Sequence, residues 1–250
     1  MPSPEFSIRP LIELDEFQNC VDIQGEVWGY DDNDIVPRRM FLLAQKIGGQ
    51  VIGAFAKAEA GEIMVGFAMA LPAYRDAQVY LHSHMLAVLP SYRNAGLGRR
   101  LKLAQRDDAI ARGIDRMEWT YDPLEIKNAY LNLTKLGAIS RRYQPDFYGA
   151  SSSPLQGGLP TDRLYAEWWL TSPRVEAALQ GQPAIPEVVE RISVPSAIAE
   201  WKRTPHLRER ARELQTSNRI KLESAFQRNL AAIGYERDAE GNGTFLLGTL

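Results

Sequence analysis

A glycine-bearing turn at residues 93–98 constrains the fold of this chain more than any other feature. It reads Arg-Asn-Ala-Gly-Leu-Gly, it follows an apolar, strand-like segment at 79–89, and it leads into a segment rich in basic residues at 97–111. A turn that leaves a strand and opens a helix exposes backbone N–H groups at the positive end of the helix dipole. These groups suit a phosphate or pyrophosphate. The sequence therefore predicts an α/β core with a site for a phosphate-bearing ligand at one edge.

Two common phosphate-binding motifs do not fit this turn. A dinucleotide-binding fingerprint needs three glycines in the spacing G-x-G-x-x-G, and only Gly96 and Gly98 are present. A P-loop ends in Gly-Lys-Ser or Gly-Lys-Thr, whereas Gly98 is followed by Arg99 and Arg100.

Hydrophobic periodicity and turn residues divide the first two thirds of the chain into alternating elements. The predicted strands are 6–11, 51–58, 63–71, 79–89, 117–121, 138–143 and 164–170. The predicted helices are 14–28, 37–47, 97–111 and 125–136. Between the last two strands, the Ser-, Gly- and Pro-rich segment 151–160 has the composition of a lid-like loop.

The pattern changes after residue 170. Prolines interrupt the segment 171–195, and Thr204 and Pro205 have the residue types that open a helix, here a long charged one reaching about residue 231. Segments 234–237 and 244–247 then predict a hairpin. We expect a core at 1–170 and a C-terminal α+β extension at 171–250 that packs on the core or at a homodimer interface.

Composition narrows the classes of protein and partner. The formal net charge is −2, so the chain lacks the excess of Lys and Arg that nucleic acid requires. The single cysteine, Cys20, excludes an internal disulfide framework and fits a reducing compartment. The N-terminus lacks the pattern of a signal peptide, and no apolar run is long enough to span a bilayer. We expect a cytoplasmic protein with no nucleic-acid or membrane partner.

The spelling Arg93-x-x-Gly96-x-Gly98, after a strand that ends Leu86-Ala87-Val88, resembles motif A of the GNAT superfamily of acyl-CoA N-acyltransferases. The order of elements over about 6–170 is similar as well, and an accidental match in a plain helix-entry turn is the alternative. The resemblance implies an α/β (α+β) fold with a mixed, mostly antiparallel twisted sheet flanked by helices. It also implies acetyl-CoA or another acyl-CoA as co-substrate, with no metal.

The resemblance assigns the residues that bind the co-substrate. The backbone of Leu86, Ala87 and Val88 would pair with the pantetheine arm. The pyrophosphate would be held by the amides of the turn, which are those of Arg93, Asn94, Ala95, Gly96, Leu97 and Gly98, together with Arg99. Arg99, Lys102 and Arg106 lie at helical spacing and predict a basic face near the anion, or else an ordinary solvated helix face.

His82 and His84 stand just before Leu86 on the same predicted strand. Residues i and i+2 of a strand share a face, so both imidazoles are expected to project the same way. The arrangement His-x-His-x-Leu-Ala-Val resembles that of the arylalkylamine N-acetyltransferases, where paired histidines help to remove a proton from the amine. Histidines hydrogen-bonded within the sheet are an open alternative, whereas a metal pair lacks a third ligand at suitable spacing.

The chain departs from the family pattern at the general acid. Many members carry a tyrosine on the helix after the fifth strand, and Leu133 occupies that position here. Tyr130, one helical turn earlier, is the predicted substitute, with core packing as its alternative role. Asn128 is predicted to contact the pantetheine.

The amine acceptor is the least constrained part of the prediction. Arg141 and Arg142, beside the 151–160 loop, are predicted to bind a carboxylate of the substrate, unless they are exposed charges on an edge strand. Longer relatives include enzymes that acylate amino acids, some with succinyl-CoA. The prediction is direct transfer, in a ternary complex, to a primary amine of a small molecule such as an amino acid. A catalytically silent acyl-CoA-binding or sensing module is the alternative.

Overall fold

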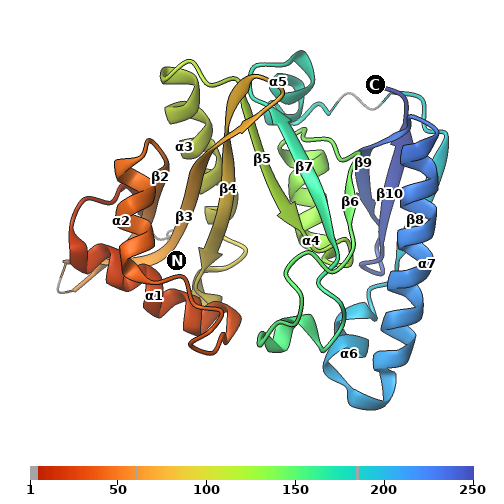
Figure 1. The fold of residues 1–250 in the computed structure, drawn as a ribbon, viewed down its shortest axis with the longest axis horizontal. Coiled ribbons are helices and arrows are strands. Elements are labelled where there is room, and N and C mark those ends of the chain that lie inside the picture. Colours follow the sequence, from red (N-terminus) through yellow and green to blue (C-terminus); the bar gives the residue numbers. More distant parts are fainter. Residues whose placement is uncertain (1–4, 60, 184–185) are drawn as a thin grey trace. The chain divides into compact units, whose positions relative to one another are not determined.

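The computed structural model describes residues 5–59, 61–183 and 186–250. The chain forms two compact units, Met1–Met117 and Glu118–Leu250, and is drawn in Figure 1. A largely antiparallel seven-stranded sheet flanked by helices confirms the predicted α/β fold class. The predicted division into 1–170 and 171–250 stays a prediction. Among the described residues, no helix has both the length and the apolarity to cross a membrane.

The first unit contains four neighbouring strands in the order β1-β2-β3-β4 and three helices. Its strands are β1 (Phe6–Pro10), β2 (Gln50–Ala58), β3 (Gly61–Arg75) and β4 (Gln78–Val88), and its helices are α1 (Leu14–Trp28), α2 (Arg38–Lys46) and α3 (Leu97–Ala111). A short 3₁₀ turn, Pro90–Tyr92, connects β4 to the 93–98 turn. The predicted helices 14–28 and 97–111 agree with α1 and α3 at both ends.

Helices cover both faces of this part of the sheet (Figure 1). On one face, residues of α1 and α2 pack with Phe67, Met85 and Ala87 in one apolar cluster. On the other face, Leu97 and Leu101 of α3 pack in a second cluster against which Leu86 and Val88 lie. The end of β4 therefore separates two cores, with Met85 and Ala87 in one and Leu86 and Val88 against the other.

A β-bulge interrupts that alternation in β4. Met69 of β3 pairs with Met85, but the next residue of β3, Ala70, pairs with Ser83. His84 is therefore the extra residue on β4. A bulge breaks the period of two that governs side-chain direction in a regular strand.

The second unit combines the rest of the large sheet with a small sheet of three strands, in the order β8-β10-β9. Its strands are β5 (Arg116–Tyr121, which begins in the first unit), β6 (Tyr143–Gln144), β7 (Arg163–Trp169), β8 (Glu190–Val194), β9 (Ala231–Arg237) and β10 (Gly243–Gly248). Its helices are α4 (Ile126–Ala129), α5 (Pro173–Leu179), α6 (Ile198–Arg203) and α7 (Arg208–Gln227), with a π-helical segment at Tyr130–Lys135 and 3₁₀ turns at Pro154–Gln156 and Pro205–Leu207.

Three local predictions for this unit differ from the structure in extent or geometry. The expected strand 138–143 is reduced to isolated bridges at Ile139 and Ser140 and to the two-residue strand β6. The expected helix 125–136 changes from α to π geometry at Tyr130. The long charged helix α7 begins at Arg208, because residues 205–207 form a 3₁₀ turn that the Thr204 side chain does not cap.

Residues after 170 pack on residues 118–170 within this unit. The Thr134 hydroxyl donates to the Tyr235 carbonyl at 2.6 Å and accepts from the Tyr235 N–H at 3.1 Å. Ser140 and Ala232 exchange two backbone hydrogen bonds of 3.1 and 2.7 Å. Strand β9 is thus attached near the C-terminal end of the helical segment after β5 and to Ser140, which follows that segment.

Candidate functional site

The 93–98 turn has the backbone of an anion cradle. Asn94 and Gly96 both have positive φ, 65° and 76°, and α3 begins at Leu97 directly after Gly96. The N–H of Arg100 bonds back to the Gly96 carbonyl at 3.1 Å, so the N–H groups just before it lie in the first turn, which has no earlier helical carbonyl to bond to. The first turn of α3 carries no acidic side chain. Its dipole and N–H groups can therefore meet a negative ligand charge.

The two glycines of the turn are needed for different reasons. Gly96 has open space around an added Cβ, but its φ of 76° strains any other residue. At Gly98 an added Cβ would meet only the Leu86 Cδ2 atom, at an ordinary 3.6 Å. Packing inside the described chain therefore does not demand glycine at 98. A small residue there leaves the backbone open to a ligand.

Basic side chains near the turn have distinct roles. The Arg93 Nε donates to the Val88 carbonyl at 3.1 Å, which folds this side chain back across the end of β4. Arg100 donates to the Phe6 carbonyl at 2.8 Å. The expected basic face of α3 is wrong for Lys102, which is buried and directed at Ser83 rather than at the ligand side. Gly96 precedes α3 directly, and Leu97, Gly98 and Arg99 form the first turn of that helix.

The backbone of Leu86, Ala87 and Val88 leads straight to this turn. These residues pair along one edge of β4 with Ala68, Phe67 and Gly66 of β3. Leu86 and Val88 are half-buried toward α3, whereas Ala87 is buried in the opposite cluster. The residues predicted for the pantetheine arm and for the pyrophosphate are therefore continuous in the first unit.

The structure brings His82 and His84 together on β4. Their ring centroids lie 6.3 Å apart with the ring planes at 38°. Both side chains are half-buried. Burial lowers the pKa of His84 below its ordinary value of 6.5, so its imidazole is neutral at pH 7 and has a lone pair with which to accept a proton.

Tyr130, Asn128 and Leu133 lie in the second unit. Leu133 is fully buried, Asn128 is exposed, and Tyr130 is half-buried at the first residue of the π-helical segment. Two cations lie near the Tyr130 ring: the Lys135 Nζ is 5.3 Å and the Arg237 Cζ 5.9 Å from its centroid. Leu133 thus supplies no acid. Tyr130 is the phenol on the same helical segment, since the hydroxyl of the adjacent Thr134 is engaged with the Tyr235 backbone.

Arg141 and Arg142 are engaged with two buried carboxylates. Arg141 pairs with Glu167 at 2.9 Å, and Arg142 pairs with Glu118 at 2.7 Å and with Glu167 at 3.4 Å. Both arginines also line an open groove of about 550 Å³ with residues of α7. Much of their charge therefore compensates Glu118 and Glu167, a role that sequence reasoning missed.

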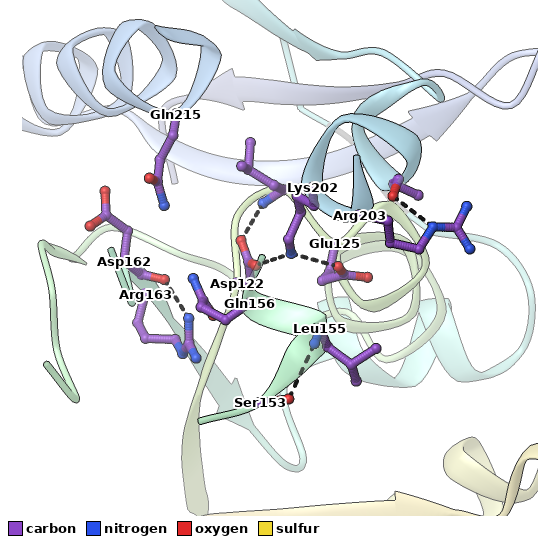
Figure 2. A network of polar contacts seen from close by, with 12 residues as sticks. Asp122, Glu125, Ser153, Leu155, Gln156, Asp162, Arg163, Lys202, Arg203 and Gln215 are labelled. Atoms are coloured by element: carbon purple, nitrogen blue, oxygen red, sulfur yellow. Dashed lines mark hydrogen bonds and ion pairs between the residues drawn. The ribbon is translucent and has the colours of Figure 1, made fainter. Parts of the chain in front are cut away.

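A second buried ionic cluster joins α6 to the segment after β5 (Figure 2). The Lys202 Nζ lies 2.9 Å from Asp122 and 3.0 Å from Glu125. The expected lid-like loop packs here: Gly157 abuts the Lys202 backbone, and the Pro160 carbonyl accepts from Gln156 at 2.8 Å and from Gln215 at 3.0 Å. Segment 151–160 is therefore held against α6 and α7.

Residues 5–59, 61–183 and 186–250 offer few groups for metal or covalent chemistry. Within that part of the chain, no group of three or more His, Cys, Asp or Glu side chains is arranged to hold a metal ion. Cys20 is fully buried, and burial raises the pKa of its thiol, which makes it a poor nucleophile.

Part of the chain matches a known protein family. Residues 17–130 match the model of the acetyltransferase (GNAT) family. No curated protein matches the chain significantly.

Solved structures with a similar fold include several acetyltransferases. The ribosomal-protein-S18-alanine N-acetyltransferase from Escherichia coli is 16% identical with a TM-score of 0.51, over 67% of this chain and 96% of that one. The putative acetyltransferase yncA from Salmonella typhimurium, solved with acetyl-CoA, is 16% identical with a TM-score of 0.51, over 73% and 98%. A NatC complex bound to Gag peptide and CoA is 16% identical with a TM-score of 0.52, over 67% and 99%.

Proposed function

Residues 17–130 are a GNAT acetyltransferase domain, and we propose that this protein transfers a short acyl group from acyl-CoA to a primary amine of a small molecule. One observation carries the proposal. The 93–98 turn, with the geometry of an anion cradle, is continuous with the strand that bears the neighbouring histidines His82 and His84. The proposed acyl-CoA-binding turn and the proposed proton acceptors thus lie in one continuous segment of the chain.

The donor is assigned to the first unit. The pyrophosphate of acyl-CoA binds the N–H groups of the 93–98 turn, and the pantetheine arm follows the backbone of Leu86, Ala87 and Val88. The positive φ of Gly96 and the space beside Gly98 support this assignment. Asn128 is a further pantetheine contact by family resemblance.

The reaction needs no enzyme nucleophile. His84, with His82 beside it, accepts a proton from the ammonium form of the acceptor. The free amine nitrogen then attacks the thioester carbonyl carbon, the C–S bond breaks, and the amide forms as its nitrogen releases the second amine proton to solvent. CoA leaves as a thiolate that takes up a proton, for which Tyr130 is the assigned donor.

The acceptor is assigned by chemistry alone. A small amine that also carries a carboxylate, such as an amino acid, fits the exposed parts of Arg141 and Arg142, and either acetyl-CoA or succinyl-CoA is a suitable donor. The fold neighbours include enzymes named for protein substrates, so a peptide amine belongs in the test. A silent acyl-CoA-binding module is the second candidate, because Leu133 stands where many relatives have the tyrosine.

A panel of donors and acceptors tests the proposal. CoA thiol release is followed with acetyl-CoA and succinyl-CoA against free amino acids, simple arylalkylamines and an N-terminal peptide. Amine-dependent thiol release supports the transferase. Tight CoA binding without any amine-dependent release across the panel overturns it in favour of the binding module.

Substitution of Gly98 by valine should separate ligand binding from folding. Because an added Cβ at 98 has room beside Leu86, we expect the free energy of unfolding to change little while the affinity for acetyl-CoA falls at least about tenfold, or about 1.4 kcal/mol. Titration calorimetry with acetyl-CoA measures this loss. Gly25→Val is the matched control, since Gly25 is a helical glycine with open space in α1. Unchanged affinity in Gly98→Val would remove this side of the turn from the site.

The pH dependence of turnover should report His84. Its pKa in the folded protein is lowered, so the imidazole is neutral at pH 7 and becomes protonated only below its ordinary value of 6.5. We expect kcat, measured with both substrates saturating, to be level near pH 7 and to fall through a pKa below 6.5. Stability should fall over the same window, because the unfolded chain binds this proton more readily than the folded one. An acid limb with its midpoint above 6.5 would contradict the assignment.

A further inference from the structure

A buried polar cluster lies beneath the histidines, on the α3 face of β4. The Lys102 Nζ donates to the Ser83 hydroxyl at 2.7 Å, and that hydroxyl donates to the Gln105 Oε1 at 2.9 Å. Gln50 extends the cluster by donating to the Gln105 carbonyl at 2.8 Å and to Asp108 at 2.6 Å. Ser83, Lys102, Gln105 and Gln50 are all at most 4% exposed.

The β-bulge at His84 explains why Ser83 reaches this cluster. In a regular strand Ser83 would share a face with Met85 and Ala87, which lie in the cluster with α1 and α2. The extra residue reverses the alternation, so Ser83 joins Leu86 on the α3 side. Ser83 therefore points toward α3 only while the bulge at His84 is present.

The energetics of the buried polar groups also favour the direction that the Ser83 side chain takes. Burial lowers the pKa of Lys102 well below its ordinary value, because removal from water disfavours the charged ammonium. The hydrogen bond to Ser83 is one contact of this buried amine, and loss of a hydrogen-bond partner at a buried group costs on the order of 1–3 kcal/mol. A regular strand would turn the Ser83 hydroxyl away and leave both Lys102 and Gln105 without this partner. The cluster therefore favours the bulged form of β4.

We propose that Ser83 is a positioning residue, whose hydrogen bonds with Lys102 and Gln105 hold the bulge of β4 and thereby fix the imidazoles of His82 and His84. The consequence for turnover rests on the proposed function, in which these imidazoles accept the amine proton. The consequence for the imidazoles themselves does not. The two can therefore be tested separately.

The sharpest test is Ser83→Ala, with the imidazoles as reporters. The chain has three histidines, so each imidazole can be assigned and titrated by NMR with one His→Gln variant apiece. Without the Ser83 hydroxyl we expect the bulge to loosen, the pKa of His84 to move toward its ordinary value, and the resonances of His82 and His84 to shift. The resonances of His206, exposed in the Pro205–Leu207 turn, should stay where they are in the parent. Ser83→Thr keeps the hydroxyl and should restore the parental titration.

A control within the same cluster separates positioning from general loss of polar packing. Gln50→Leu removes the hydrogen bonds to the Gln105 carbonyl and Asp108 but leaves those of Ser83. It should leave the His84 titration unchanged. Lys102→Met removes the hydrogen-bond donor to Ser83 and keeps an unbranched side chain. If Ser83→Ala folds poorly, Lys102→Met should change the His84 titration in the same direction.

Steady-state kinetics of the same variants tests the effect of Ser83 on turnover. We expect Ser83→Ala to lower kcat by about 10- to 100-fold with the KM for acyl-CoA unchanged, since misplacement of a catalytic group by about 1 Å costs on the order of 100-fold. Parental His84 titration in folded Ser83→Ala, or equal changes in Gln50→Leu, would overturn the positioning role. If the parent shows no transfer at all, the proposed function fails, while the imidazole titration still decides the role of Ser83.

Discussion

His84→Gln is expected to reduce kcat by about 100- to 10,000-fold, the range that a positioned general base contributes. Glutamine keeps a polar side chain of similar size but has no basic nitrogen, so it cannot remove the proton of the acceptor ammonium. The KM for acyl-CoA should stay nearly unchanged, because the 93–98 turn and its N–H groups are intact. The variant should also lose the acid limb of the kcat profile. Steady-state kinetics with a saturating amine measures both effects.

Two companion variants make this result interpretable. His206→Gln removes the exposed third histidine and should behave as the parent. His82→Gln should lower kcat by less than His84→Gln, because His82 neighbours the proposed base with its ring 6.3 Å away. Equal turnover in His84→Gln and the parent would exclude His84 from the mechanism and leave both histidines as sheet residues.

Lys202→Met is expected to give the largest loss of stability, about 3–5 kcal/mol in the free energy of unfolding at pH 7. Burial acts to lower the pKa of Lys202, but Asp122 and Glu125 outweigh it and hold that pKa above its ordinary value. The charged form is therefore the stable one at pH 7, and this contribution declines only at alkaline pH, as the pH rises through the raised pKa. Methionine leaves Asp122, at 9% exposure, as a buried carboxylate without its cation (Figure 2).

Urea denaturation followed by tryptophan fluorescence measures this loss. Trp119, Trp168, Trp169 and Trp201 lie in the second unit and only Trp28 lies in the first, so the signal reports the unit that carries Lys202. The double variant Lys202→Met with Asp122→Asn should recover part of the stability. Lys221→Met, at an exposed lysine of α7, is the control. A loss in Lys202→Met no larger than in that control would show that the cluster does not stabilise the fold.

Local patterns in the sequence were sufficient for most elements of the first unit. The amphipathic spacing of α1 and the positive-φ glycines at 29 and 96 set helix boundaries by short-range physics, and the predicted limits of α1 and α3 are correct. The GNAT resemblance, read from the spacing of Arg93, Gly96 and Gly98, is confirmed for residues 17–130. Glycine turns and capping geometry act within a few residues, so a sequence reveals them directly.

Features that depend on distant partners were not predictable. The segment 138–143 looked like a strand, yet Ile139 bonds with Glu167 and Ser140 with Ala232, which limits each to a bridge. Lys202 meets Asp122 across 80 residues, and Arg142 meets Glu118 across 24. Ion pairs of this kind leave no periodic signal. The change from α to π geometry at Tyr130 likewise has no signature in helix propensity.

The position of Lys102 in the cluster around Ser83 differs from the position that its helical spacing suggests. Lys102 and Arg106 share helical spacing with Arg99 and suggested one basic face, but Lys102 is 3% exposed beneath β4. Leu97, Leu101 and Gln105 are also buried on α3, so position 102 lies beside the core-facing stripe. Only the bulge at His84 turns Ser83 toward it, and a bulge has no clear signature in a single sequence.

Binding of CoA at the 93–98 turn is tested most directly by amide chemical shifts of the isotopically labelled protein. CoA is expected to shift the backbone amides of Gly96, Leu97, Gly98 and Arg99, whereas pantetheine, which lacks the pyrophosphate, should leave them in place. Gly113, a positive-φ glycine at the far end of α3, should not respond to either ligand. Saturating CoA binding with the amides of the 93–98 turn unmoved would contradict the assignment of this turn as the pyrophosphate site.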